Sequence, residues 1–221
     1  MSTQKGTLIN KYTPNYVIFD LETTGISPNY DEVIEISALK VKGGEVVDEF
    51  NTLVNPGRKI PFGATKVNGI TNAMVAEAPA FSHVLEEFLD FAEGLVLVGH
   101  NIARFDMKFI WRDAEQYFGE IPQNNYVDTL QVARKHLPKM ELAEHYGISS
   151  EGAHRALNDC YMNQKVYECM VAEMREAHQK RVEEARKKAS EDVEVQQRPQ
   201  HFTVKIRGVV ERITYQNPEN G

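Results

Sequence analysis

The sequence predicts an α/β fold with a central mixed β-sheet flanked by helices. Two observations predict it: strand patterns come one after another early in the chain, and short apolar runs then alternate with amphipathic helical segments. With 221 residues the chain has room for one well-buried domain and an appendage, but not for two full domains.

The first half of the chain predicts three antiparallel strands and a helix. Residues 15–21, "NYVIFDL", form an apolar run typical of a buried strand. Residues 31–56 contain two alternating strand patterns around Gly43 and Gly44, which indicates a hairpin. Residues 79–94 place apolar side chains at helical spacing, so we expect an amphipathic helix there.

The second half alternates strands and helices. Residues 95–101 predict a short strand covered on both faces, and residues 104–119 predict a helix. Residues 125–137 predict a strand that runs into a helix, and residues 140–147 a short helix. From about Ala156 a long helix carries an apolar stripe made of Met162, Val166, Met170 and Met174.

These patterns divide the chain into four parts. Residues 1–14 are an N-terminal extension, and residues 15–175 form the main domain. Residues 176–200 are a charged helix followed by a linker. Residues 201–221 alternate apolar and polar side chains, which predicts a short β-strand tail. So small a piece is rarely stable alone, so it must pair with the main domain or with a second chain.

Composition excludes several classes of protein. The net charge of −7 argues against a broad basic face that coats nucleic acid, although not against an enzyme that grips a few nucleotides around metal ions. No apolar run is long enough for a membrane span, and the polar start lacks the centre of a secretory signal. Cys160 and Cys169 lie too far apart on one helix for a disulfide. We therefore expect a cytoplasmic protein.

Two acids interrupt the first apolar run. Asp20 and Glu22 project from one face of their strand, while Leu21 points the other way. Two adjacent carboxylates repel each other unless a cation lies between them or one of them takes up a proton. The alternative is an exposed strand edge, where acids need no explanation. The turn at "TTG" puts the pair at the end of the strand, where α/β folds tend to place ligands.

Three further residues are candidates for the same site. Asp106 lies at the start of a predicted helix, where it could also simply complement the helix dipole. His154 and Asp159 would lie about 140° apart on an unbroken helix. They can converge only if His154 belongs to the loop before that helix; the alternative is that both are surface residues.

Taken together, these motifs resemble the DEDDh exonucleases, the family of the DNA polymerase III epsilon subunit. The resemblance rests on "FDLETTG", "GHNIARFD" and "HRALND", in the family's order, and on the segment "NPGRKIPFGATKVNGIT" between the first two. It covers residues 16–170 and implies a ribonuclease-H-like fold. It also implies that four acids bind metal and that His154 is the general base; the acids are Asp20, Glu22, Asp106 and Asp159.

The chemistry of phosphodiester hydrolysis requires such a set. Two divalent cations can together activate water and stabilise the leaving oxygen. Mg²⁺ and Mn²⁺ prefer oxygen ligands, so four carboxylates suit two ions of either metal. A neutral histidine can accept the proton of the attacking water near pH 7.

The resemblance also implies residues that bind the terminal nucleotide, namely Thr23, Val67, Asn68, His100 and Phe105. Thr23 could instead bond within its turn, and Val67 and Phe105 could be core residues. Asn68 stands where many relatives have histidine; it can donate a hydrogen bond but carries no positive charge.

The sequence therefore predicts a metal-dependent 3′→5′ exonuclease that releases nucleoside 5′-monophosphates from a single-stranded 3′ end, with DNA favoured, in proofreading or repair. One alternative is an exoribonuclease similar to ribonuclease T or oligoribonuclease, since sugar preference depends on contacts to one 2′-hydroxyl. Another is a weakly catalytic nucleic-acid-binding scaffold. A two-carboxylate glycosidase would leave the histidine and two acids without a role. The C-terminal tail is a candidate contact for a DNA polymerase or for a second copy of the chain.

Overall fold

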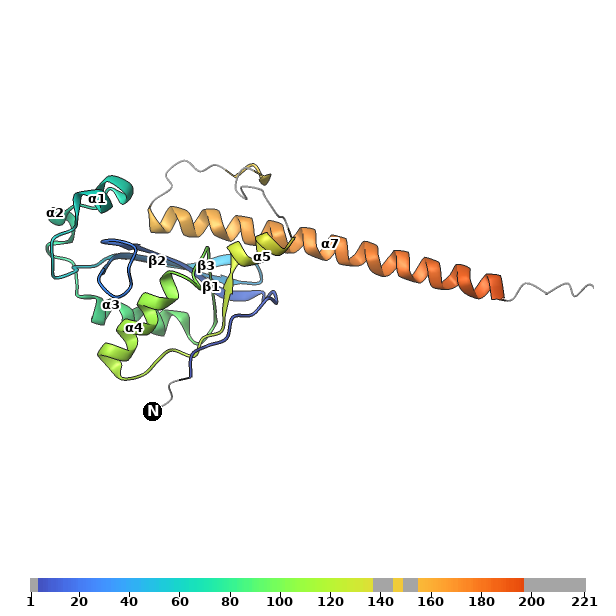
Figure 1. Cartoon of the computed structure of the whole chain (residues 1–221), viewed down its shortest axis with the longest axis horizontal. Coiled ribbons are helices and arrows are strands. Elements are labelled where there is room, and N and C mark those ends of the chain that lie inside the picture. The colour runs from blue at the N-terminus through green and yellow to red at the C-terminus, as the bar shows by residue number, and fades with distance from the viewer. Residues whose placement is uncertain (1–3, 137–144, 149–154, 197–221) are drawn as a thin grey trace, which may run out of the picture. The chain divides into compact units, whose positions relative to one another are not determined.

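A five-stranded mixed sheet with helices on both faces forms the main part of the protein (Figure 1). The computed structural model describes residues 4–136, 145–148 and 155–196, with side chains up to Lys188. Its strands are β1 (Asn15–Thr23), β2 (Val33–Lys42), β3 (Glu45–Leu53), β4 (Val96–Gly99) and β5 (Tyr126–Asp128). Its helices are α1 (Phe62–Asn68), α2 (Asn72–Val75), α3 (Phe81–Ala92), α4 (Asp106–Phe118), α5 (Thr129–His136) and α7 (Ala156–Gln196).

The strand order in the sheet is β3-β2-β1-β4-β5. The first three strands are antiparallel neighbours, whereas β4 pairs with β1 and β5 with β4 in parallel. The hairpin between β2 and β3 turns at Gly43 and Gly44, which have φ angles of 64° and 88°. Two consecutive positive φ angles favour glycine, so the predicted hairpin and the predicted mixed sheet are both confirmed.

The two faces of β1 belong to two different cores because side chains alternate along a strand. Val17, Phe19 and Leu21 pack with apolar side chains of α3 and α4. Tyr16 and Ile18 face the other way and pack with the N-terminal half of α7. The face that meets α7 therefore also carries the next even-numbered residues of β1.

Three of the four predicted stripe residues of α7 contact the core, whereas Met162 is half-buried and lies outside that cluster. Val166 and Met170 are buried and Met174 is half-buried, and all three contact the core beneath the helix. The chain up to Ala177 forms one compact unit, and the residues from His178 onward belong to a second. Side chains 178–188 of that second unit are exposed and mostly charged. Neither α7 nor any other helix in the described ranges carries the apolar length that crossing a bilayer requires.

Burial in the hairpin strands differs from the alternation that the sequence suggests. β2 is buried from Val33 to Val41, because it lies inside the sheet with cores on both faces, whereas most side chains of the edge strand β3 are exposed or half-buried. Residues 55–71 also contain a helix that the periodicity did not predict, α1, and α2 follows directly. Both helices are too short for a clear periodic pattern.

The predictions for the two ends of the chain and for residues 140–147 have different outcomes. In the N-terminal extension, Ile9 N–H donates to the Tyr126 carbonyl at 2.8 Å, so residues 7–9 run beside β5. The short helix expected over residues 140–147 and the strand tail expected over residues 201–221 fall mainly or wholly outside the described residues.

Candidate active site

The C-terminal end of β1 carries the first two predicted site residues. Asp20 and Glu22 follow Tyr16 and Ile18 on the face of the sheet that meets α7. Each side chain is only partly exposed. A register shift between Glu22 and Thr23 interrupts the regular pairing with β2 just beyond the two acids, so the carboxylates lie next to an irregularity at the end of the strand.

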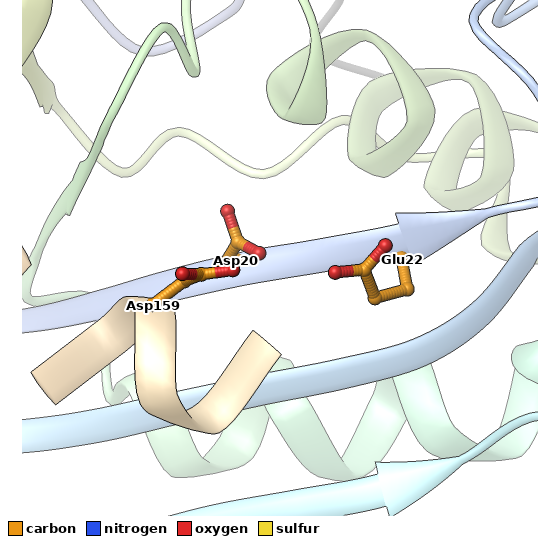
Figure 2. Close-up of side chains that lie close together, drawn as sticks. All are labelled: Asp20, Glu22 and Asp159. Carbon is orange, nitrogen blue, oxygen red and sulfur yellow. The ribbon is translucent and has the colours of Figure 1, made fainter. Parts of the chain in front are cut away.

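Asp159 reaches the same place from the first turn of α7. The helix is held there partly by Cys160, whose Sγ lies 3.3 Å from the Ser37 carbonyl of β2. Carboxylate oxygens of Asp20, Glu22 and Asp159 all lie within 4.8 Å of one another. Figure 2 shows the first two side chains along one strand and Asp159 approaching from the helix. Residues about 140 positions apart in the sequence thus form one carboxylate cluster.

Asp106 lies beside this cluster but does not belong to the three-oxygen group. It is the first residue of α4, and its side chain is buried. Its Oδ1 accepts a hydrogen bond of 3.2 Å from the backbone N–H of Leu21, between the two acids of β1. The structure thus brings three of the predicted metal ligands close to one another, and it holds the fourth, Asp106, against the same strand by a hydrogen bond.

Burial and mutual repulsion disfavour the charged forms of these acids. Burial raises the pKa of Asp20 well above its ordinary value, and the neighbouring charges of Asp106, Asp159 and Glu22 raise it further. Burial also raises the pKa of Glu22 to about 7, although a hydrogen bond from Asn68 lowers it. The pKa of Asp106 is raised by burial to about 7, against the effect of its backbone hydrogen bonds. Ionising these acids together is therefore unfavourable in the folded protein, and a bound cation would offset the repulsion between their negative charges.

This donor set fits a hard divalent cation. All of the converging atoms are carboxylate oxygens, which Mg²⁺ and Mn²⁺ prefer, and the part-exposed surroundings leave room for water ligands. In the part of the chain that the structure describes, carboxylates alone make up this group.

The predicted nucleotide-binding residues have different surroundings. The Thr23 hydroxyl donates to the Gly25 carbonyl at 2.6 Å, so its side chain bonds within the turn. His100 is exposed just after β4, with Nδ1 3.3 Å from Thr129 Oγ1.

The other three lie on or beside α1 and α4. Val67 is 60% exposed, so it is not a core residue. Asn68 is buried; its side-chain oxygen Oδ1 accepts from the Ile70 N–H at 3.1 Å, and its side-chain amide hydrogen-bonds Glu22. Phe105 is half-buried against the core, and its ring contacts Phe109 edge-on at 5.2 Å between centroids. Asn68 thus engages a candidate metal ligand directly, which the sequence analysis had not predicted.

His154, the predicted general base, lies outside the described residues. The chain is described again from Arg155, whose carbonyl accepts the Asp159 N–H at 3.1 Å.

The sequence analysis missed two buried acids near the site. Glu35 lies in β2 directly opposite Glu22, and Asp128 lies at the end of β5. The Asp128 carboxylate accepts hydrogen bonds from the backbone N–H groups of Asn101 and Ala103, so it fixes the loop that leads to Asp106. Both acids are 1% exposed. The signal was present in "VIEISALKV", where an acid interrupts an apolar run just as Asp20 does.

Exonucleases and DNA polymerase III proteins are similar in sequence to most of this chain. A family model described as "Exonuclease" matches residues 17–167. The DNA polymerase III subunit epsilon of Aquifex aeolicus is 39% identical over 158 residues, which are 69% of this chain and 78% of that protein. The DNA polymerase III PolC-type of Caldanaerobacter subterraneus subsp. tengcongensis is 38% identical over 200 residues, but these are 87% of this chain and only 14% of that protein.

Solved structures agree on the fold. Escherichia coli exonuclease I in complex with a dA16 oligonucleotide superposes with a TM-score of 0.64 at 19% identity, over 75% of this chain and 42% of that chain. Exonuclease X in complex with 5′ overhanging duplex DNA gives a TM-score of 0.55 at 24% identity, over 71% of this chain and 90% of that chain. The mixed sheet and its flanking helices are thus a ribonuclease-H-like exonuclease fold, and the chain belongs to the exonuclease family as a 3′→5′ exonuclease.

Proposed function

We propose that the protein is a metal-dependent 3′→5′ exonuclease that releases nucleoside 5′-monophosphates from single-stranded DNA. One observation carries this proposal: in a chain of the exonuclease family, carboxylate oxygens of Asp20, Glu22 and Asp159 converge within 4.8 Å. Acids whose charged forms are disfavoured by burial would gain stability from a cation and could then meet a phosphate without repelling it.

The proposed roles of the four acids follow their positions, and that of His154 follows the family resemblance. Asp20, Glu22, Asp106 and Asp159 would hold two ions of Mg²⁺ or Mn²⁺. When bound, the ions would supply positive charge to the phosphodiester and lower the pKa of water. His154 would take the proton of the attacking water as the general base.

The chain's own hydrogen bonds support these roles. The Leu21 N–H fixes one oxygen of Asp106, and the Asn68 amide fixes Glu22. Such hydrogen bonds would help the carboxylates to keep their orientation before metal binds. Val67 is exposed next to Asn68 and offers an apolar surface to a base, and Phe105, Thr23 and His100 complete the proposed nucleotide site.

DNA is the favoured substrate because the relatives are DNA polymerase III proteins and one solved neighbour holds a dA16 oligonucleotide. The same relatives support a role in proofreading or repair. The matched region is only 14% of the PolC-type relative. Similarity to that relative therefore does not by itself assign its cellular role to this chain, and the role in proofreading or repair is part of the proposal.

The test is degradation of single-stranded oligonucleotides labelled at either end, made as DNA and as RNA, with Mn²⁺, Mg²⁺ or EDTA. We expect stepwise shortening of the 5′-labelled strand, mononucleotides from the 3′ label, and no reaction with EDTA. Asp20→Ala should remove activity, whereas Asp48→Ala, which changes an exposed acid on β3, should not.

Each other outcome has a definite reading. Faster loss of RNA than of DNA would reassign the substrate to RNA. Binding of oligonucleotide without turnover in either metal would favour the weakly catalytic scaffold. Activity that survives Asp20→Ala or EDTA would contradict the proposed metal site.

We further propose that residues 176–221 serve contacts outside the catalytic unit, with a DNA polymerase or with a second copy of the chain. In this segment, the side chains of residues 178–188 are exposed and mostly charged, and none of them is buried. Removal of residues 197–221 followed by a mass measurement in solution tests the second copy. An unchanged monomeric mass in both proteins would exclude it.

A further inference from the structure

Glu35 is a buried acid that the proposed reaction does not use. It lies in β2 in register with Glu22 of β1, so both side chains point to the face that meets α7. Only 2% of its side chain is exposed. A carboxylate so deeply buried is costly unless it is paired and hydrogen-bonded.

Among the residues that the structure describes, its hydrogen-bond partners come from the start of α7. Arg155 Nη2 lies 2.8 Å from Glu35 Oε1 and Arg155 Nε lies 3.3 Å from Oε2, so the guanidinium makes a two-pronged contact. The Ala156 N–H donates to Oε2 at 3.3 Å. Glu35 thus accepts, from another element, a hydrogen bond from one of the N–H groups at the helix start that have no partner within the helix.

The same turn carries a candidate metal ligand. The Asp159 N–H donates to the Arg155 carbonyl at 3.1 Å, so Arg155 and Asp159 are joined by one of the first hydrogen bonds at the start of the helix. Glu35 therefore connects the strand beside Glu22 to the turn that presents Asp159.

We propose that Glu35 and Arg155 form a clamp that positions Asp159 against Asp20 and Glu22 for metal binding. This inference rests on the proposed function, because it assigns both residues a role at the same metal site. Neither residue is a ligand or a catalytic residue in it: they act through the placement of Asp159.

A purely structural role would have a different signature. Farther along, α7 is already anchored by the buried side chains Val166, Tyr167 and Met170. Loss of the clamp should therefore leave the helix on the sheet and change mainly its first turn. Outer-shell partners of metal ligands typically change metal affinity about 10- to 100-fold.

The sign of the charge gives a sharp test. Arg155 carries a positive charge close to Glu22. If electrostatic repulsion were its only effect, removing this charge should strengthen the binding of a cation. The clamp predicts the opposite. Arg155→Met should weaken Mn²⁺ binding by about 10-fold or more, because Asp159 loses its alignment and Glu35 is left unpaired.

The experiment is calorimetric titration of the metal-free full chain with Mn²⁺ in the absence of nucleic acid, with thermal unfolding measured in parallel. Metal binding is the readout because Arg155 adjoins His154, and turnover alone would mix the two effects. The matched control is Glu93→Gln, which breaks the 3.2 Å ion pair of Glu93 with Lys40, on the same strand β2 but on the opposite face. It should leave Mn²⁺ affinity unchanged.

Two more variants make the result decisive. Glu35→Gln should weaken Mn²⁺ binding, and the double variant Glu35→Gln/Arg155→Met should be no weaker than the poorer single one, because the two residues act as one unit. If Arg155→Met does not fold, Arg155→Lys keeps the charge but lacks the fork, and should lower affinity severalfold.

Unchanged or tighter Mn²⁺ binding in a folded Arg155→Met or Arg155→Lys protein would overturn the clamp while leaving the proposed function intact. Additive losses in the double variant would also overturn it. A wild-type chain that binds no Mn²⁺ and degrades no oligonucleotide would overturn both, so the two failures are distinguishable.

Discussion

The backbone N–H of Leu21 donates a hydrogen bond of 3.2 Å to Oδ1 of Asp106, although the two residues are 85 positions apart in the sequence. Leu21 packs into the core on the far side of the sheet, which keeps this N–H in place. A main-chain donor between Asp20 and Glu22 therefore aligns the acid of α4 with the acids of β1.

The first prediction concerns the charge of Asp106. Asp106→Asn keeps an oxygen that can accept from Leu21 but removes the negative charge. We expect the Mn²⁺-dependent rate to fall by more than about 100-fold, beyond the typical cost of an outer-shell change. Since burial raises the pKa of Asp106 to about 7, the metal-free variant should unfold at a higher temperature than wild type at pH 8.

The control for this variant is Asp90→Asn, an exposed acid on α3. It should match wild type in rate and in unfolding temperature. An Asp106→Asn protein with a rate within a few-fold of wild type would remove Asp106 from the ligand set.

The second prediction concerns Asn68 and the pKa of Glu22. In Asn68→Ala, Glu22 loses a hydrogen bond that lowers its pKa, so its pKa should rise further above about 7. Metal binding needs the ionised carboxylate, so the acidic limb of the pH profile of kcat/KM should move to higher pH. A hydrogen bond to a charged group contributes about 1.5–3 kcal/mol, which corresponds to a shift of about one to two pH units.

Val67→Ala is the matched control on the same helix. Val67 is exposed, and its apolar side chain cannot hydrogen-bond Glu22. This variant can therefore change KM but should keep the wild-type midpoint of the acidic limb of the pH profile. An unshifted midpoint in Asn68→Ala would mean that Asn68 does not tune Glu22.

The sequence motifs led to the carboxylates, whereas their supports became visible only in three dimensions. Asp20, Glu22 and Asp159 stand out because each belongs to a short local motif whose residue types suit metal binding. Glu35 stands in an equally anomalous position, but its partner Arg155 is 120 positions away, and no local pattern connects them.

The length of an element decides whether it could be predicted from the sequence. The longer helices and buried strands follow from periodicity, because each is long enough to repeat its pattern. α1 and α2 have seven and four residues, and tertiary contacts of Ile60, Ile70 and Val75 stabilise this region instead. Asn68 is buried by that packing, so its contact with Glu22 could not be predicted from the sequence.

The third prediction is the pH dependence of stability without metal. The folded pKa of Glu22 is raised from 4.5 to about 7, and those of Asp20 and Asp106 are also raised. The folded state then binds protons more tightly than the unfolded chain. The resulting stabilisation is fully present below the unfolded pKa values and is lost as the pH rises toward 7.

The measurement is the difference in unfolding temperature between wild type and Glu22→Gln in EDTA, from pH 4.5 to pH 8. Gln cannot ionise at position 22, so the unfolding temperature of Glu22→Gln relative to that of wild type should rise with pH across this range. Added Mn²⁺ at pH 8 should stabilise wild type more than the variant. A constant difference across the range would show that the pKa of Glu22 is not raised.

The last prediction separates the proposed base from the proposed ligands. His154→Ala should lower kcat by about 10²- to 10⁴-fold, the usual contribution of a general base, with Mn²⁺ affinity and KM almost unchanged. Asp159→Asn, five residues along the chain, should instead lose Mn²⁺ affinity together with turnover. His83→Ala, an exposed histidine on α3, is the control and should change neither quantity. If His154→Ala turns over as fast as wild type, another group must take the proton. If it loses Mn²⁺ affinity as Asp159→Asn does, His154 acts at the metal and not as the base.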